Sequence, residues 1–83
     1  DIQDFRIYPN PNNGDFTIEL ATPAKQEMSM VIMSLTGQHL FEKQAVSGNG
    51  TQTIEANYLP GGMYFLQMIS NGRMISVDKF VKQ

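Results

Sequence analysis

Residues 64–79 read YFLQMISNGRMISVDK, in which two apolar runs lie on either side of an Asn-Gly pair. The two-residue loop Asn71-Gly72 favours a type I′ turn, because both loop positions then take the positive φ that suits the twist of the flanking strands. The pattern therefore predicts a β-hairpin. Its expected cross-strand pairs are Met68 with Ile75, Leu66 with Val77, and Tyr64 with Lys79.

Both faces of this hairpin carry apolar side chains. We assign one face to the core, namely Tyr64, Leu66, Met68, Ile75, Val77 and Val81. The opposite face carries Met63, Phe65, Ile69, Met74 and Phe80. Either another part of the same domain covers this second face, which we favour, or it is an exposed patch that docks on a partner. Whether the domain forms a homodimer through this face stays open.

The rest of the chain also has a hydrophobic period of two, interrupted by Gly, Pro or Asn at the spacing of an antiparallel sandwich. In Asp15–Leu20, apolar residues alternate with polar ones, which indicates one buried and one solvated face. Weaker strands are expected at Phe5–Ile7, Thr51–Ala56 and His39–Val46. Met28–Ser34 is apolar on both faces and reads as a central strand covered on both sides. The fold class is all-β.

The composition excludes several functional classes but does not identify the function. The chain has 83 residues, which we interpret as a single domain, and it contains no cysteine and has a net charge of −2. This charge gives no attraction for nucleic acid. The lone His39 is read as a surface residue, and the carboxylates are scattered singly, so we expect no catalytic residue, no metal and no cofactor. Because the sequence begins with Asp1, we read residues 1–83 as a fragment of a larger secreted precursor.

Three turn-rich motifs accompany the strands. The first is Tyr8–Gly14, called the elbow below, in which two prolines fix φ, asparagines can close Asx turns, and Gly14 can take a positive φ. The second is Leu35-Thr36-Gly37-Gln38, and the third is Leu59–Leu66, of the form Leu-Pro-x-Gly-x-Tyr-x-Leu. The chain ends in Lys79-Phe80-Val81-Lys82-Gln83.

In this order and spacing, the three motifs and the Lys-x-Val-Lys ending resemble the C-terminal sorting domains of the type IX secretion system. The resemblance spans about residues 4–83 and implies a seven-stranded, immunoglobulin-like antiparallel β-sandwich, in agreement with the strand count. The motif residues are interpreted as structural: Pro9, Asn10, Pro11, Gly14, Gly37, Leu59, Pro60, Gly62 and Tyr64. For the Pro60-Gly61-Gly62 turn we expect that it aims the next strand and that Tyr64 packs under it.

The resemblance also implies partners and a location. The domain would follow an N-terminal cargo in Bacteroidetes-type bacteria, and the cargo would pass through the periplasm to an outer-membrane translocon that recognises the domain. A sortase-like peptidase would then remove the domain, cutting near Asp1, and the cargo would remain at the outer membrane or cell surface or be secreted.

Our recognition hypothesis concerns Lys79, Phe80, Val81, Lys82 and Gln83. A last strand at a sheet edge leaves backbone groups unpaired, and a receptor strand could pair with them. The alternative is that Lys79 and Lys82 only protect that edge from aggregation. The rival function is an adhesive or spacer module of the immunoglobulin or fibronectin type.

Overall fold

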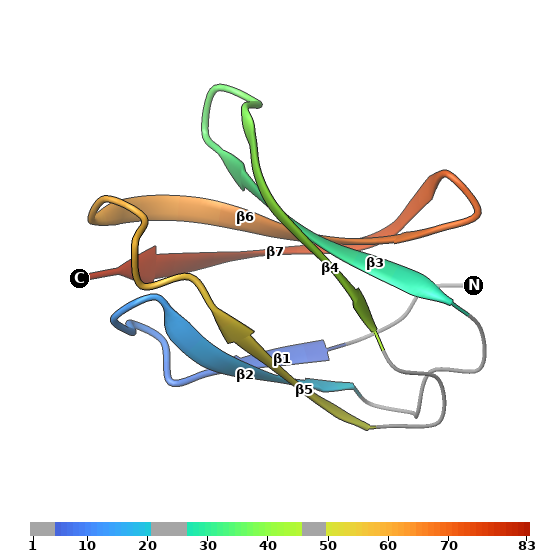
Figure 1. The fold of residues 1–83 in the computed structure, drawn as a ribbon, viewed down its shortest axis with the longest axis horizontal. Coiled ribbons are helices and arrows are strands. Elements are labelled where there is room, and N and C mark those ends of the chain that lie inside the picture. The colour runs from blue at the N-terminus through green and yellow to red at the C-terminus, as the bar shows by residue number, and fades with distance from the viewer. Residues whose placement is uncertain (1–4, 21–26, 46–49) are drawn as a thin grey trace.

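The computed structural model describes residues 5–20, 27–45 and 50–83. Within these ranges the chain forms strands and no helix (Figure 1). The strands are β1 (Phe5–Tyr8), β2 (Asp15–Leu20), β3 (Met28–Ser34), β4 (His39–Ala45), β5 (Thr51–Glu55), β6 (Gly62–Ser70) and β7 (Arg73–Lys82). One sheet has the order β1-β2-β5 and the other the order β4-β3-β6-β7, with all neighbours antiparallel. The predicted all-β class is confirmed.

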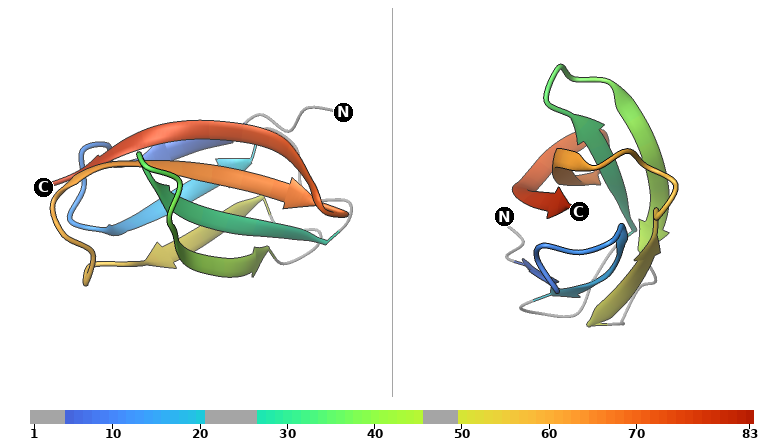
Figure 2. Two further views of the ribbon diagram at one scale, coloured as in Figure 1. Left: turned by 90° about the horizontal axis from the view of Figure 1, so that it is seen from above. Right: turned by 90° about the vertical axis from the view of Figure 1, so that its left-hand side faces the viewer.

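The two sheets lie face to face, as the end-on view in Figure 2 shows. Alternation along β2 turns Phe16, Ile18 and Leu20 into the space between the sheets, where all three are buried. The other sheet meets them with inward side chains of β3, β6 and β7. Burial of this apolar surface is the main stabilising contribution in a chain without disulfides. The core comprises Ile7, Phe16, Ile18, Leu20, Met28, Met30, Ile32, Ile54, Ala56, Leu59, Tyr64, Leu66, Met68 and Phe80.

The remaining strand predictions agree with the structure, apart from residue bounds. β3 lies between β4 and β6 and is the predicted central strand, but its outward residues Ser29 and Met33 are half-buried, so the predicted cover on both sides is incomplete. Its residue Val31 is buried although it points away from the other sheet, between its register partners Glu42 and Gln67. The expected strand His39–Val46 is β4, and Val46 lies outside the described residues.

The β6–β7 hairpin has the predicted turn but not the predicted register. Asn71 and Gly72 have φ of 52° and 75°, as a type I′ turn requires. Beyond the turn, a β-bulge between Met68 and Ile69 of β6 and their partners in β7 shifts the pairing by one residue. The observed pairs are Met68 with Ser76, Leu66 with Asp78, and Tyr64 with Phe80, so the three predicted pairs are wrong.

The shift exchanges the two faces of β7, because side chains alternate with a period of two. Phe80, predicted for the second face, is in the core with 0% of its surface exposed. Val77 and Val81, predicted for the core, are 46% and 36% exposed. The second face is therefore open where we expected it to be covered: Met63 is 43% and Met74 is 56% exposed, while Phe65 and Ile69 are half-buried.

Candidate recognition site at the terminal strand

β7 is an edge strand, because it is last in the order of its sheet. Along an antiparallel strand, residues alternately direct their backbone N–H and C=O toward and away from the neighbouring strand. Val81 and Gln83 direct theirs away from β6, since both bond to the elbow. By the same alternation Lys79 and Val77 also face outward.

The elbow fills the C-terminal part of this edge. The backbone N–H of Asn12 donates to the Val81 carbonyl over 3.0 Å, and the Gln83 N–H donates to the Asn12 carbonyl over 2.7 Å. The side chain of Asn10 adds two contacts: its Oδ1 accepts from the Val81 N–H at 3.0 Å, and its Nδ2 donates to the Lys79 carbonyl at 3.5 Å. The Lys79 N–H bonds to the Asp78 carboxylate. This contradicts the expectation that residues 79–83 offer unpaired backbone groups to a receptor strand.

Asn12 holds the elbow in the shape that makes this possible. Its side chain is buried, accepts from the Gly14 N–H over 2.8 Å, and donates to the Pro9 carbonyl over 3.0 Å. Pro9 and Pro11 have no N–H that would need a partner. Gly14 has a φ of 101°, and its carbonyl accepts from the Ala56 N–H, which joins the elbow to the segment after β5. Hydrogen bonds thus connect the elbow to the terminal strand of one sheet and to the segment that follows β5 of the other sheet.

The five predicted recognition residues divide into two groups. Phe80 points into the core, where its ring centroid lies 4.6 Å from that of Phe16 and 5.6 Å from that of Tyr64. Lys79, Val81 and Gln83 are exposed and Lys82 is half-buried. A partner of the folded domain can therefore contact the side chains of Lys79, Val81, Lys82 and Gln83, but not that of Phe80.

A comparison with known protein families assigns the chain to a family. Residues 6–83 match the family described as "Secretion system C-terminal sorting domain". The chain belongs to this family. A search of curated proteins found no match. The sorting domain is a C-terminal signal for type IX secretion, and a protein that carries it is exported to the outer membrane or the cell surface or is secreted.

The remaining motif residues of the sorting domain have structural positions. Leu59 is buried in the core, and the Tyr64 hydroxyl donates to the Pro60 carbonyl, so Tyr64 packs under the turn as expected. Gly62 has a positive φ of 154° at the start of β6. Gly37 has a φ of 90° in the turn between β3 and β4, where its N–H donates to the Ser34 carbonyl.

The Tyr64 hydroxyl gives a direct test of the turn. We expect Tyr64→Phe to lower the free energy of unfolding by about 1 kcal/mol, because the Pro60 carbonyl loses its donor while the ring remains packed. For a domain of this size the melting temperature should fall by about 4–8 °C. The control is Tyr58→Phe, since Tyr58 is exposed and its change should leave the melting temperature unaltered. Equal melting of all three proteins would contradict this role.

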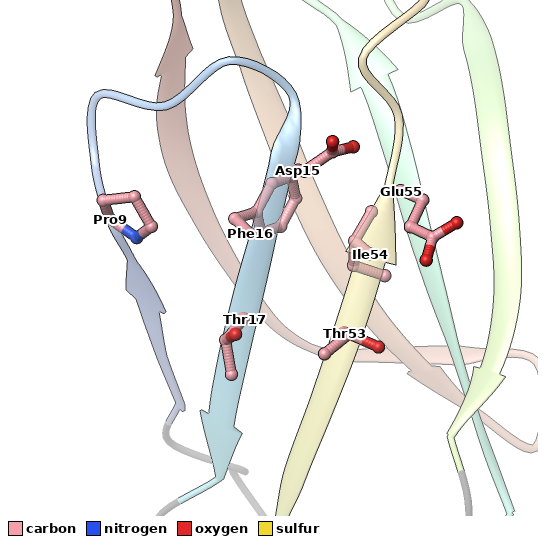
Figure 3. Close-up of a pocket in the computed structure, with 7 residues that line it drawn as sticks. All are labelled: Pro9, Asp15, Phe16, Thr17, Thr53, Ile54 and Glu55. Atoms are coloured by element: carbon pink, nitrogen blue, oxygen red, sulfur yellow. The ribbon is translucent and has the colours of Figure 1, made fainter.

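Two other features of the sorting domain bear on chemistry. A hollow of about 340 Å³ is lined by Pro9, Asp15, Phe16, Thr17, Thr53, Ile54 and Glu55 (Figure 3). Asp15 and Glu55 are register partners, but no group of three His, Cys, Asp or Glu side chains suited to a metal occurs in the described part of the chain.

His39 is exposed, as expected, and lies 3.4 Å from a Glu42 oxygen. Among the described residues, no helix is long and apolar enough to cross a membrane.

The contact between elbow and terminal strand was missed at the level of sequence. The prolines and asparagines predicted a rigid turn, and that turn is present. Its partner is about 70 residues away in the chain, since Asn10 and Val81 are separated by 71 positions. No local pattern in the sequence links such distant segments.

Proposed function

We propose that the export machinery recognises the sorting domain through the exposed side chains of Lys79, Val81 and Gln83 and the half-buried side chain of Lys82, presented on a strand that the elbow holds in place. The hydrogen bonds between the elbow and residues 79–83 are the observation that carries the proposal. They occupy the outward backbone groups there, so that side chains, and not a new backbone ladder, are what a partner meets. The two lysines add positive charge in a chain of negative net charge.

The same proposal includes the wider route. The domain is the C-terminal part of a larger precursor whose cargo crosses the periplasm, meets translocon components at the outer membrane, and is separated from the domain by a sortase-like peptidase. The cut would lie near Asp1, outside the described residues. The domain itself is not an enzyme, and a folded sample should be silent in hydrolase assays. A homodimer is a further partner, through a surface separate from residues 79–83.

The test fuses the 83 residues to a periplasmic reporter in a host that has the type IX apparatus. We expect the wild-type fusion outside the cell, and we expect Lys79→Glu with Lys82→Glu to retain the reporter in the periplasm. The substitutions keep a charge at each position, so they preserve protection of the edge against aggregation. Because both side chains are at least partly exposed, melting should change by little.

Lys43→Glu is the control, since it makes the change of charge of one of the two lysine substitutions at an exposed position of β4, at the opposite edge of the sheet. Unchanged export of the double lysine variant, with normal export of the control, would refute recognition through these lysines and leave edge protection as their role. Retention of the wild-type fusion itself would favour the adhesive or spacer module, which has no reason to leave the periplasm.

A further inference from the structure

The elbow leaves one part of the β7 edge uncovered. Ser70 and Arg73 close the two-residue turn and therefore face each other, so the backbone groups of Met74 point away from β6. After the bulge, Ser76 and Asp78 pair with β6 and Val77 points outward. Met74 and Val77 are thus successive outward-facing residues, and within the described ranges the structure shows no partner for their outward backbone groups.

The side chains along this segment complement a second copy of themselves. If two β7 strands pair antiparallel about a two-fold axis between Ile75 and Ser76, Met74 lies opposite Val77 of the other copy, and Arg73 lies opposite Asp78. Met74 and Val77 share the outer face of the sheet, since their register partners Ile69 and Gln67 do. Arg73 and Asp78 share the opposite side, with Ser70 and Leu66. The register therefore sets apolar against apolar and positive against negative on both sides of the axis.

A hollow lies next to this segment. It has a volume of about 300 Å³ and is lined by Phe65, Val77, Asp78 and Lys79. In the paired arrangement Met74 of the second copy lies directly opposite Val77, beside this hollow. Met74 is 56% exposed in the single chain. An unbranched thioether side chain adapts readily to such an irregular space.

We propose that the domain binds a second copy of itself through the Arg73–Asp78 segment of β7, with Met74 opposite Val77 and Arg73 opposite Asp78 across a two-fold axis. Such a two-fold contact uses the same patch on both copies, so it closes at two and does not propagate. The contact is small and its charges are exposed, which makes it a weak and salt-sensitive dimer. The inference does not depend on the role of Lys79 and Lys82 in export.

The test measures self-association by sedimentation equilibrium up to about 1 mM protein, a range that detects millimolar dissociation constants. We expect wild type to dimerise reversibly, and Arg73→Asp or Asp78→Arg to weaken dimerisation by about tenfold, because each places like charges opposite each other twice. An equimolar mixture of the two variants should dimerise again. In the mixed pair the two carboxylates of the Arg73→Asp copy face the two guanidinium groups of the Asp78→Arg copy.

Glu42→Lys is the matched control for Asp78→Arg, since it makes the same change of net charge at an exposed position of β4, which is the opposite edge of the sheet. It should dimerise like wild type. Hydrogen exchange of the Met74 and Val77 amides in wild type gives a second measurement that needs no variant, and it should slow as concentration rises.

Three results would overturn the proposal: a monomeric wild type at about 1 mM by both measurements, failure of the mixture to restore association, or equal weakening by Glu42→Lys. A monomeric domain whose Arg73 and Asp78 variants lose export in the reporter assay would assign this edge to a receptor and not to a second copy. Loss of export on changing Lys79 and Lys82, with dimerisation intact, keeps the two proposals separate.

Discussion

Gly14→Ala is expected to unfold the domain at moderate temperature. An added Cβ would lie 2.5 Å from the Ala56 carbonyl oxygen and 2.6 Å from the Asn57 Cα, both backbone atoms that cannot rotate away. The φ of 101° adds backbone strain for any residue with a side chain. The clash and the strain together should lower the free energy of unfolding by about 3 kcal/mol or more, which is a large share of the stability of a small domain. By thermal melting, the transition should fall by about 15–25 °C.

Gly37→Ala separates the destabilisation caused by backbone strain from that caused by the clash with Ala56 and Asn57. Gly37 also has a positive φ, of 90°, but an added Cβ there would meet no atom within 4 Å. Its substitution should therefore cost only the backbone term, about 1–2 kcal/mol. If both variants lose the same stability, the contact between the elbow and the segment after β5 is not the cause. If Gly14→Ala melts like wild type, the position assigned to the elbow is wrong.

Phe80→Ala is expected to have the largest effect of any change in the terminal strand. The ring is fully buried between Phe16 and Tyr64, so its removal leaves a cavity that connects both sheets. Losses of about 3–5 kcal/mol are typical of such truncations. Chemical denaturation should show a lower midpoint with an unchanged slope, because the surface exposed on unfolding is similar.

Val81→Ala is the neighbouring control. Val81 is 36% exposed on the opposite side of the same strand, and its truncation should cost less than about 1 kcal/mol. Similar losses from the two variants would contradict the observed register and favour the regular hairpin expected from sequence. The comparison also bears on export, since a secretion defect of Phe80→Ala would follow from unfolding, whereas a defect of Val81→Ala in a stable domain would point to recognition.

The register of β7 shows where local reasoning fails. The Asn-Gly pair predicted its turn correctly, because a type I′ turn depends on the φ values that these two residues accept. The bulge that follows is not encoded by a turn residue. It places Phe80, in preference to Val81, between Phe16 and Tyr64, and that choice depends on the side chains of the facing sheet.

The candidate site, like the register of β7, was predicted only in part from the sequence. Lys79, Val81, Lys82 and Gln83 were predicted as recognition residues at the end of the chain, and their side chains are at least partly exposed, although Val81 was expected in the core. The hydrogen bonds from Asn10 and Asn12 were not predicted, and they change what a partner can reach on this strand. The open edge at Met74 and Val77 likewise follows from the bulge and from where the elbow ends.

By itself the sequence determined that the chain is all-β, which residues of most strands face inward, and where it turns. These properties follow from the two-residue period of a strand and from the φ preferences of Gly, Pro and Asn, which act over a few residues. Only the tertiary structure decided which face of β7 is buried and which part of its edge is closed. Both depend on contacts between segments far apart in the chain, such as Phe16 with Phe80 and Asn12 with Val81, whose geometry no local pattern specifies.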